Sequence, residues 1–300
     1  MEVVGKSGEL ASWWSTLVVA LIQVPTLYRE LRCRIDASSI DECRRSRITK
    51  NTVKMSMSVE VLKSRAQIDQ ARDELRRRRL SFTSSPWERL FRKLGVSNGI
   101  NVGDTLKSWD VLKTADFIEK NVSKGAPILD IGAYASELLY VLHHLGFSNL
   151  TGIDLSPDIK KMSYRDCIRY EVSDFMHTPF EAGSFDAISA TSVIEHGFNS
   201  KALLAEISRL LRPRGYFVAS FDYWPQKLNT TDIEFFGMDW RIFSEQEVRE
   251  FLNEAAAYSL HPRGKIQLDA QEKPISCANK SYTFAWLVLQ KAPEPGRVQA

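Results

Sequence analysis

The chain has 300 residues, of which 44% are hydrophobic and 26% are charged. This composition is typical of a globular protein, so it excludes a wholly disordered chain, a collagen-like chain and a polytopic membrane protein. The length suits one large domain, or one domain with an appendage. Residues 1–95 contain 19 Lys or Arg against 11 Asp or Glu, and the remainder contains 21 against 26. A basic front therefore precedes a mildly acidic body.

An uncharged, largely apolar segment covers residues 10–28, and three arginines follow it at 29, 32 and 34. It is marginal in length for a spanning helix, which needs about 20 apolar residues. Three interpretations remain open: a helix packed on the body or on a partner, an interfacial or signal-anchor helix with peripheral membrane contact, and a loose extension. A cleavable signal peptide is disfavoured because the positive charge follows the apolar run. The four cysteines show no paired spacing, which favours a cytoplasmic protein.

The polar run 36–54 is predicted to be a linker, so residues 1–54 are taken as an apolar helix plus linker. Residues 55–103 are predicted to form a helical, basic appendage. Its main helix is expected over 55–80 from the 3–4 spacing of apolar residues, and it ends in Arg76–Arg79. That arginine run suits either a solvated helix end or a contact with phosphates, nucleic acid or anionic lipid. Another short helix is expected to start at Ser85.

From residue 104 the pattern changes to alternating helices and strands, and we assign 104–290 to one domain followed by a flexible tail, 291–300. A helix is expected over 104–120, and others within "SELLYVLHHLG" and "SKALLAEISRLLRPRG". Short apolar runs between them predict parallel strands: "APILDIG", "NLTGIDLS", "IRYEVSDF", "SFDAISAT" and "GYFVASFD". This alternation predicts an α/β fold whose mostly parallel, doubly wound sheet is covered on both faces.

Three aspartates stand where consecutive predicted strands end. The turn after the first strand begins at Asp130, and such a turn presents backbone N–H groups and a helix N-terminus to a ligand. Asp154 ends the second strand and is placed to accept ribose hydroxyls. Asp174 ends the third, beside Phe175, and is placed to accept an adenine amine. Each aspartate alone could be only a helix cap or a turn former. Their order along the chain is the stronger signal.

In these motifs the chain resembles the class I S-adenosylmethionine (SAM)-dependent methyltransferases, of the type 11-like group. The matching pieces are "ILDIGAYASELL", "LTGIDLSPDI", "YEVSDFMHTPFEAGSFDAISATSVIEHG" and "EISRLLRPRGYFVASF". The resemblance covers about residues 104–222 and extends to the strand "YTFAWLVLQK". It implies a Rossmann-like fold, with SAM as cofactor, and a methyltransferase activity.

The resemblance also implies a role for each matched position. The methionine part of the cofactor is expected beside Asp130, Gly132, Ala133 and Tyr134, with Ala190 and Thr191 lining the sulfonium side. The ribose is expected on Asp154 and the adenine on Leu155, Asp174 and Phe175.

One departure concerns the cofactor turn, where the family places glycine at two positions that here are Tyr134 and Ser136. Because glycine permits positive φ and close backbone approach, this predicts either a reshaped turn or a lost contact. Tyr134 is expected either to form a wall between cofactor and acceptor or to occupy the methionine site.

Methyl transfer is an in-line displacement, so the protein mostly aligns the reactants and excludes water. For a hydroxyl acceptor, a general base is also useful. The predicted catalytic residues are His196 and Asp222, with Tyr223 as an alternative to Asp222. A packing role for His196 stays open, and Glu195 is interpreted as structural. The remaining histidines show no ligand spacing, so no metal is expected.

The expected acceptor is a small molecule or a glycan, methylated at oxygen or nitrogen. Aromatic residues gather after the fifth strand, where they suit a lid or acceptor pocket: Tyr223, Trp224, Phe235, Phe236, Trp240 and Phe243. No Asn/Asp-Pro-Pro-Tyr or Pro-Cys motif of nucleic-acid methyltransferases is present, so nucleic acid is disfavoured. Three alternatives remain: a catalytically silent SAM-binding scaffold, an RNA methyltransferase that uses the basic front, and a nicotinamide-dependent enzyme, which the missing G-x-G-x-x-G turn disfavours.

Overall fold

We describe the protein from a computed structural model that covers residues 57–83, 90, 94, 100–197 and 199–293. Contacts along the chain separate Met1–Lys54 from Met55–Ala300, and all described residues belong to the second unit. The apolar segment 10–28, the linker 36–54, the helix start expected at Ser85 and most of the tail lie outside the described residues.

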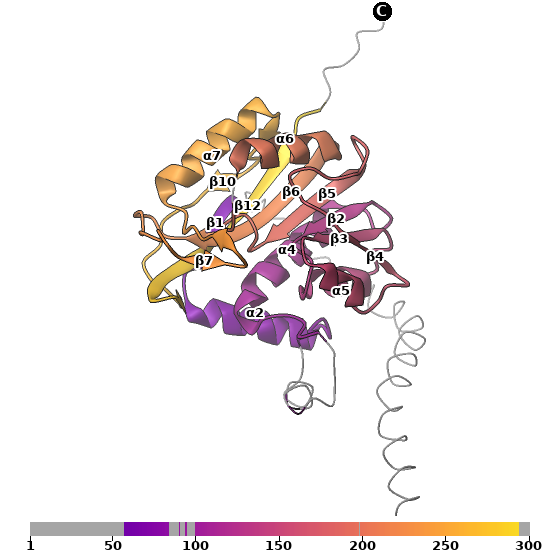
Figure 1. Cartoon of the computed structure of the whole chain (residues 1–300), viewed down its shortest axis with the longest axis horizontal. Helices are drawn as coiled ribbons and strands as arrows, with labels where there is room; N and C mark the ends of the chain where they lie inside the picture. The colour runs from indigo at the N-terminus through magenta and orange to yellow at the C-terminus, as the bar shows by residue number, and fades with distance from the viewer. Residues whose placement is uncertain (1–56, 84–89, 91–93, 95–99, 198, 294–300) are drawn as a thin grey trace, which may run out of the picture. The chain divides into compact units, whose positions relative to one another are not determined.

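A mixed sheet of ten strands forms the centre of this unit (Figure 1), and its main path runs β10-β1-β12-β6-β5-β2-β3-β4. The strands from β6 to β4 along this path are parallel to one another. Strand β12 pairs antiparallel with β6, and β1 pairs antiparallel with β12. The main strands are β1 (Met57–Val61), β2 (Ile128–Ile131), β3 (Leu150–Asp154), β4 (Ile168–Val172), β5 (Phe185–Thr191), β6 (Leu211–Tyr223) and β12 (Lys280–Lys291).

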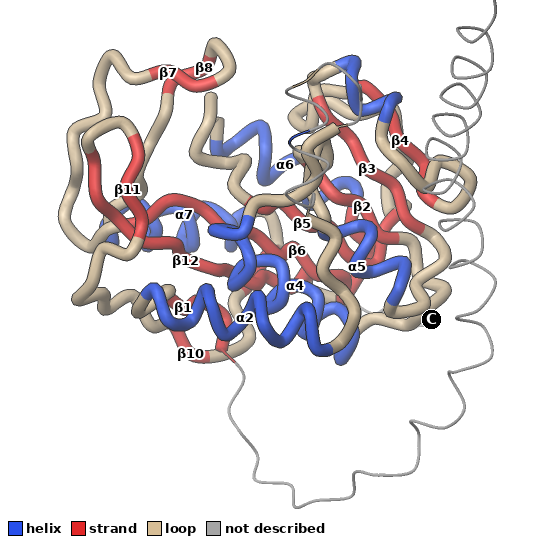
Figure 2. Tube along the Cα trace, turned by 90° about the horizontal axis from the view of Figure 1, so that it is seen from below, coloured by secondary structure: helices blue, strands red, loops and turns tan. Residues whose placement is uncertain are grey.

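Helices cover both faces of the sheet, as the alternating sequence pattern predicts. Helices α6 (Ser200–Leu210) and α7 (Glu245–Ala257) lie on one face, and α2 (Arg65–Arg77), α4 (Ser108–Asn121) and α5 (Leu138–His144) lie on the other (Figures 1 and 2). Every residue of β2 is buried, which explains its continuous apolar run. Helix α6 buries one face, made of Leu203, Leu204, Ile207 and Leu210. The α/β, doubly wound prediction is therefore confirmed.

The N-terminal part of the described chain differs from the sequence prediction. The single helix expected over 55–80 is instead strand β1 followed by helix α2. Residues 59–61 of β1 pair with 285–287 of β12, a contact between positions more than 200 residues apart that no local pattern reveals. Helix α2 then packs beside α4. These residues are part of the central fold, because β1 provides the strand partner of residues 285–287 of β12.

Shorter elements complete the unit. A two-stranded hairpin is formed by β7 (Glu234–Phe235) and β8 (Met238–Asp239). The remaining elements are η3 (Thr105–Lys107), η4 (Pro157–Lys161), β9 (Leu260–His261), β10 (Lys265–Ile266) and β11 (Ile275–Cys277). Within the described residues, no helix is both long and apolar enough to cross a membrane.

Candidate active site at the carboxyl ends of the strands

The turn after β2 is the centre of the candidate cofactor site. Gly132 has a φ of +71°, and a Cβ atom at this position would lie 2.3 Å from Cγ2 of Val193. The second left-handed residue of the turn is Ala135, with a φ of +60°. Neither Tyr134 nor Ser136 has a positive φ. The turn is thus reshaped so that the two positions where the family has glycine tolerate side chains.

Tyr134 is half-buried and packs against the core cluster that includes the α5 residues. Its backbone N–H donates to Oδ2 of Asp154 at 3.1 Å, so the turn after β2 is tied to the end of β3. Ala133 is buried beneath the turn, and its N–H donates to the Ile153 carbonyl at 3.0 Å. These contacts fix the backbone that the sequence assigns to the methionine part of the cofactor.

Asp154 closes β3 with both carboxylate oxygens engaged: Oδ1 accepts the Ser156 N–H at 2.8 Å and Oδ2 accepts that of Tyr134. Each oxygen keeps a further lone pair for a ligand. Next to it, Leu155 is 51% exposed, and Val172 at the end of β4 is 46% exposed. Two exposed apolar side chains beside a carboxylate are the chemistry that a nucleoside requires.

Asp174 follows β4 and is exposed; its Oδ1 accepts the Met176 N–H at 2.9 Å. Phe175 does not stand on the surface beside it, because its side chain is 8% exposed and belongs to a core cluster. The third aspartate, Asp130, is buried at the end of β2, where its Oδ1 accepts the Ser189 hydroxyl at 2.7 Å. Burial raises the pKa of Asp130 to about 7, and nearby Asp154 adds to the rise. Ala190 is buried on the adjacent strand β5, and Thr191 is half-buried at its end.

The predicted catalytic residues lie at the ends of β5 and β6. His196 is half-buried, and its Nδ1 has no hydrogen-bond partner. Burial and the neighbouring Lys107 lower the pKa of His196 to about 4. A histidine with this pKa is neutral at physiological pH but is a weak base. Asp222 is buried and accepts the Trp240 indole N–H at 2.8 Å. Tyr223 is fully buried, and its hydroxyl donates to the Leu268 carbonyl at 2.6 Å, so it is not available as a base.

The aromatic residues predicted to form a lid divide into a group at the β7–β8 hairpin and a group buried in the core. Phe235 and Phe236 belong to the β7–β8 hairpin, and their ring centroids lie 6.0 and 5.7 Å from that of His196. Phe236 is 88% exposed, so it offers a free ring at the mouth of the site. Trp240 packs against the hairpin, with its ring centroid 5.2 Å from that of Phe235. Phe243 is buried in the core.

Comparison with known proteins points to a class of enzyme for part of the chain. The family model of a methyltransferase domain matches residues 129–219, which run from β2 into β6. Residues 129–219 are therefore similar to a methyltransferase domain. The match covers the turn after β2 and all three strand-end aspartates, as well as His196.

Curated relatives share parts of this methyltransferase domain. Human EEF1A lysine methyltransferase 2 is 29% identical over 148 residues, which cover 42% of this chain and 61% of that protein. The ubiquinone biosynthesis O-methyltransferase of Xanthomonas oryzae pv. oryzae (strain PXO99A) is 31% identical over 98 residues, covering 30% of this chain and 41% of that protein. The chain thus spans less than two thirds of the length of these relatives. Among solved structures, geranyl diphosphate C-methyltransferase from Streptomyces coelicolor A3(2) has a TM-score of 0.48 at 17% identity, covering 77% of this chain and 100% of that one.

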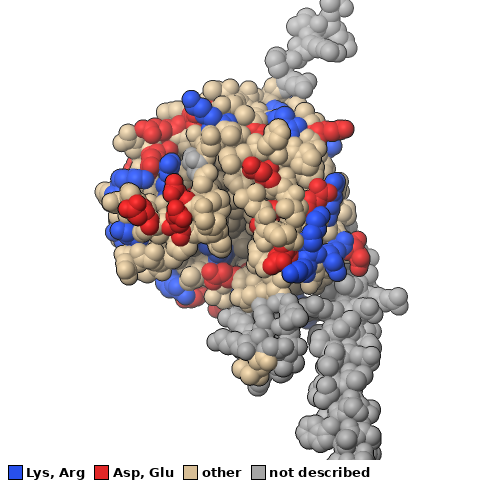
Figure 3. All heavy atoms as spheres, in the orientation of Figure 1, with Lys and Arg blue, Asp and Glu red and all other residues tan. Residues whose placement is uncertain are grey.

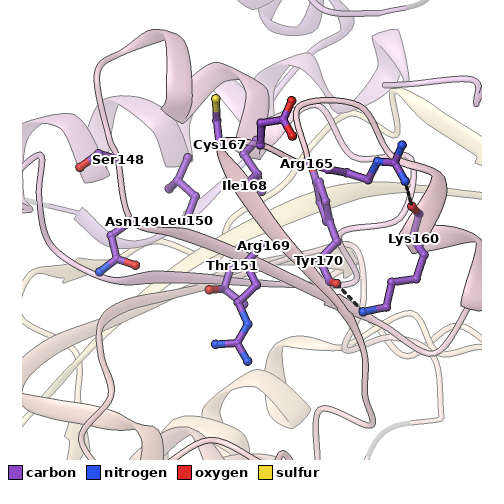
Figure 4. A pocket seen from close by; sticks show the side chains of 11 residues that line it. Ser148, Asn149, Leu150, Thr151, Lys160, Arg165, Cys167, Ile168, Arg169 and Tyr170 are labelled. Carbon is purple, nitrogen blue, oxygen red and sulfur yellow. Dashed lines mark hydrogen bonds between the residues drawn. The ribbon is translucent and has the colours of Figure 1, made fainter.

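A cavity of about 520 Å³ lies away from the site of the methyltransferase domain (Figure 4). It is lined by the segments that lead into β3 and β4, so it opens at the amino ends of these strands. Its cations are engaged locally: Lys160 donates to the Tyr170 carbonyl at 2.7 Å, and Arg165 donates to the Lys160 carbonyl at 3.2 Å. Ligands of such sheets bind at the opposite, carboxyl ends.

Sequence reasoning missed two features of the described chain. The first is the ion pair of Arg72 on α2 with Glu137 before α5, whose side chains are 4% and 1% exposed. The second is Lys107, which reaches from η3 to the ends of β5 and β6. Both Arg72 and Lys107 precede the family motifs and lie in polar sequence, so no local signal marked them. Among the residues placed by the structure, no group of three His, Cys, Asp or Glu side chains is arranged to hold a metal ion.

Proposed function

We propose that the protein binds SAM across the carboxyl ends of β2, β3, β4 and β5 and transfers its methyl group to a small-molecule or glycan acceptor. The observation that carries this proposal is the placement of Asp130, Asp154 and Asp174 at the ends of three parallel strands that neighbour one another in the sheet. SAM supplies an activated methyl group on a sulfonium. The chain has to bind the cofactor, orient the acceptor and exclude water.

The residues around the strand ends fit this cofactor. Asp154 and Asp174 each present a carboxylate toward which ribose hydroxyls and an adenine amine are natural donors. The exposed side chain of Leu155 provides an apolar surface for the base. A Cβ atom at position 132 would clash with Val193, so this position has to be glycine, and its backbone carries no side chain where the methionine part is expected. Tyr134 packs on the α5 side of the turn, so in this arrangement it flanks the cofactor away from the proposed acceptor.

The acceptor is proposed to lie on the side of β5 and β6, under the β7–β8 hairpin. The exposed ring of Phe236 and the neutral imidazole of His196 suit a sugar or a planar small molecule better than an anion. His196 is assigned to positioning the acceptor, because its low pKa makes it a poor base. Asp222 is buried, so it is proposed to influence the acceptor only through the side chains that cover it.

Two alternatives are less well supported. An RNA acceptor would need the arginine run at the end of α2, but Arg76, Arg77 and Arg78 are each paired with carboxylates. Charges of both signs are interspersed on the face seen in Figure 3. A catalytically silent scaffold was suggested by Tyr134 and Ser136, but the observed turn accommodates both side chains.

A protein lysine acceptor is the second candidate, because human EEF1A lysine methyltransferase 2 is among the relatives.

The proposal is tested by calorimetry with SAM and S-adenosylhomocysteine (SAH) on the full chain and on Asp154→Ala. Loss of a charged acceptor costs about 1.5–3 kcal/mol per hydrogen bond, so SAM affinity should fall by at least about tenfold. The matched control is Asp158→Ala, which removes an exposed carboxylate four residues away that pairs with Lys161 at 2.7 Å. Unchanged affinity in Asp154→Ala would refute the assigned cofactor site. A screen of sugars, phenols, amines and proteins with labelled SAM then identifies the acceptor.

A further inference from the structure

A buried polar cluster stands at the ends of β5 and β6, and we call it the Lys107 cluster: Lys107, Asp110, Ser192, Glu195, Ser220 and Asp222. The Nζ atom of Lys107 is hydrogen-bonded to the Ser192 hydroxyl. It lies 4.0 Å from Oδ2 of Asp110 and 3.9 Å from Oδ1 of Asp222. It also lies 3.5 Å from the centroid of the Phe284 ring, a favourable place for a cation.

Several carboxylate oxygens of the cluster have no hydrogen-bond donor paired with them. Three carboxylates surround one ammonium group, and all three are almost completely buried. Both oxygens of Asp110, Oε2 of Glu195 and Oδ1 of Asp222 have no hydrogen-bond partner. Buried polar atoms are ordinarily paired. The unpaired carboxylate oxygens of this cluster are therefore unusual, and hydroxyl groups of Ser220, Ser192 and Tyr282 are close enough to lower the pKa values of Asp110, Glu195 and Asp222.

Only two members of the cluster reach the surface. The Lys107 side chain is 24% exposed, and Ser192 is half-buried. Ser192 directly follows Thr191, which is expected on the sulfonium side of the cofactor. It has a φ of +54°, so its backbone is held in an unusual conformation there. An acceptor that approaches the methyl group thus meets Ser192 and Lys107 first and the carboxylates only through them.

We propose that Ser192 and Lys107, backed by Asp110, Glu195 and Asp222, form the acceptor subsite, and that the group they take is a neutral hydroxyl. This inference rests on the proposed methyltransferase function and deepens it. A hydroxyl is favoured over an amine because the attacking hydroxyl oxygen develops negative charge as its proton leaves, whereas an attacking amine nitrogen gains positive charge beside the ammonium group of Lys107. Lys107 stabilises the negative charge that develops on the acceptor oxygen, and Ser192 connects that oxygen to the carboxylates.

The reaction balances within this set of residues. The acceptor oxygen forms a bond to the methyl carbon while the carbon–sulfur bond breaks and its electron pair stays on sulfur. The hydroxyl proton passes through Ser192 to an ionised carboxylate of the cluster. The groups that face this proton are Lys107 from η3, Asp110 from α4, Glu195 and His196 after β5, Asp222 from β6 and Tyr282 from β12. Burial raises the pKa of Asp110 to about 7, which suits proton uptake near neutral pH, and burial also raises the pKa of Glu195.

A purely structural role would be to hold α4 against the sheet. The helix already has such contacts further along: Lys113 pairs with Glu60 of β1 at 2.6 Å, and Thr114 accepts the Trp286 indole N–H of β12 at 3.1 Å. Lys113 also lies 4.7 Å from the centroid of the Trp286 ring. Lys113 thus matches Lys107 in charge, carboxylate partner and aromatic contact, but it is remote from the strand ends. It provides the matched control.

The test uses two cofactor analogues that differ in charge at the methyl position. Sinefungin carries a primary ammonium there, whereas SAH is uncharged. Their affinities are measured by calorimetry at a single pH of about 8.5. Lys107→Met should raise the affinity for sinefungin relative to SAH by about tenfold, because one nearby positive charge is removed. Lys107→Arg and Lys113→Met should leave the ratio within about twofold. If Lys107→Met does not fold, Lys107→Gln replaces it.

The outcomes separate the two proposals. Failure of the unsubstituted chain to bind SAH refutes the proposed function, and the inference falls with it. If SAH binds but Lys107→Met leaves the sinefungin-to-SAH ratio unchanged, or shifts it no more than Lys113→Met does, the subsite is refuted alone. In the labelled acceptor screen, methyl ethers are the expected products. Label recovered only as methylated amine would overturn the hydroxyl assignment, even with the ratio shifted.

Discussion

The buried ion pair between Arg72 and Glu137 is predicted to be the strongest single link between helix α2 and the cofactor turn. Both Glu137 oxygens accept from the guanidinium, at 2.5 and 3.2 Å, and one also accepts the Phe82 N–H at 3.0 Å. The Arg72 Nε–H donates to the Ser108 hydroxyl at 2.8 Å, which connects the pair to α4. Glu137 immediately precedes α5, so the pair connects α2 to the segment between the turn and α5.

Arg72→Met removes the guanidinium and leaves the Glu137 carboxylate buried with one backbone donor. Breaking a buried ion pair on one side costs about 3–5 kcal/mol. This is a large share of the roughly 5–15 kcal/mol by which a domain is stable. The double variant Arg72→Met with Glu137→Leu removes both charges, and it should recover at least half of the loss because no unpaired charge remains.

Urea denaturation followed by tryptophan fluorescence measures these free energies of unfolding. The control is Arg76→Met on the same helix, where Arg76 pairs with Asp73 at 3.2 Å and both side chains are mostly exposed. It should change stability by less than about 0.5 kcal/mol, as exposed pairs contribute little. A loss below about 1 kcal/mol in Arg72→Met, or a double variant less stable than the single one, would show that the pair does not support the fold as argued.

Three further predictions concern the cofactor turn. Tyr134→Gly should leave SAM affinity within about tenfold by calorimetry, because position 134 has no positive φ for glycine to relieve; a large gain in affinity would instead mean that the ring occupies the methionine site. Gly132→Ala should destabilise the protein by about 2–4 kcal/mol, because position 132 has a left-handed φ and the new Cβ atom would clash with Val193. Gly146→Ala is the control: its φ is +90°, but no neighbour lies within 4 Å, so the substitution should cost about 1–2 kcal/mol. Equal losses of melting temperature in the two variants would contradict this prediction. Because burial raises the pKa of Asp130 from 3.8 to about 7, the folded state binds the extra proton, so stability should fall as pH rises from about 4 to 7. Asp130→Asn should flatten this dependence in urea titrations at pH 5 and 7, and an unchanged slope would show that Asp130 does not titrate in this range.

The alternation of apolar runs and amphipathic helices predicted the parallel strands β2 to β6 and the helices between them. These elements are local in sequence, because each strand is followed by the helix that covers it and each burial pattern is short. The strand-end aspartates were found for the same reason: each stands immediately at the end of a recognisable strand. The turn after β2 was located correctly, but the sequence left its shape open, since only the folded backbone shows that Ala135 rather than Tyr134 or Ser136 takes the left-handed conformation.

Contacts between distant segments were decided by tertiary structure. Strand β1 lies in the sheet because β12 offers it an antiparallel partner, and its five residues carry too short a pattern to be distinguished from a helix start. The pairing of Arg72 with Glu137 and the reach of Lys107 to Ser192 join residues 65 and 85 positions apart. In sequence these side chains are ordinary charges on polar segments. Packing of α2, η3 and α4 onto the sheet buries Arg72 and Glu137 and leaves Lys107 only 24% exposed, and that burial makes their charges matter for the stability of the fold and the proposed chemistry of the site.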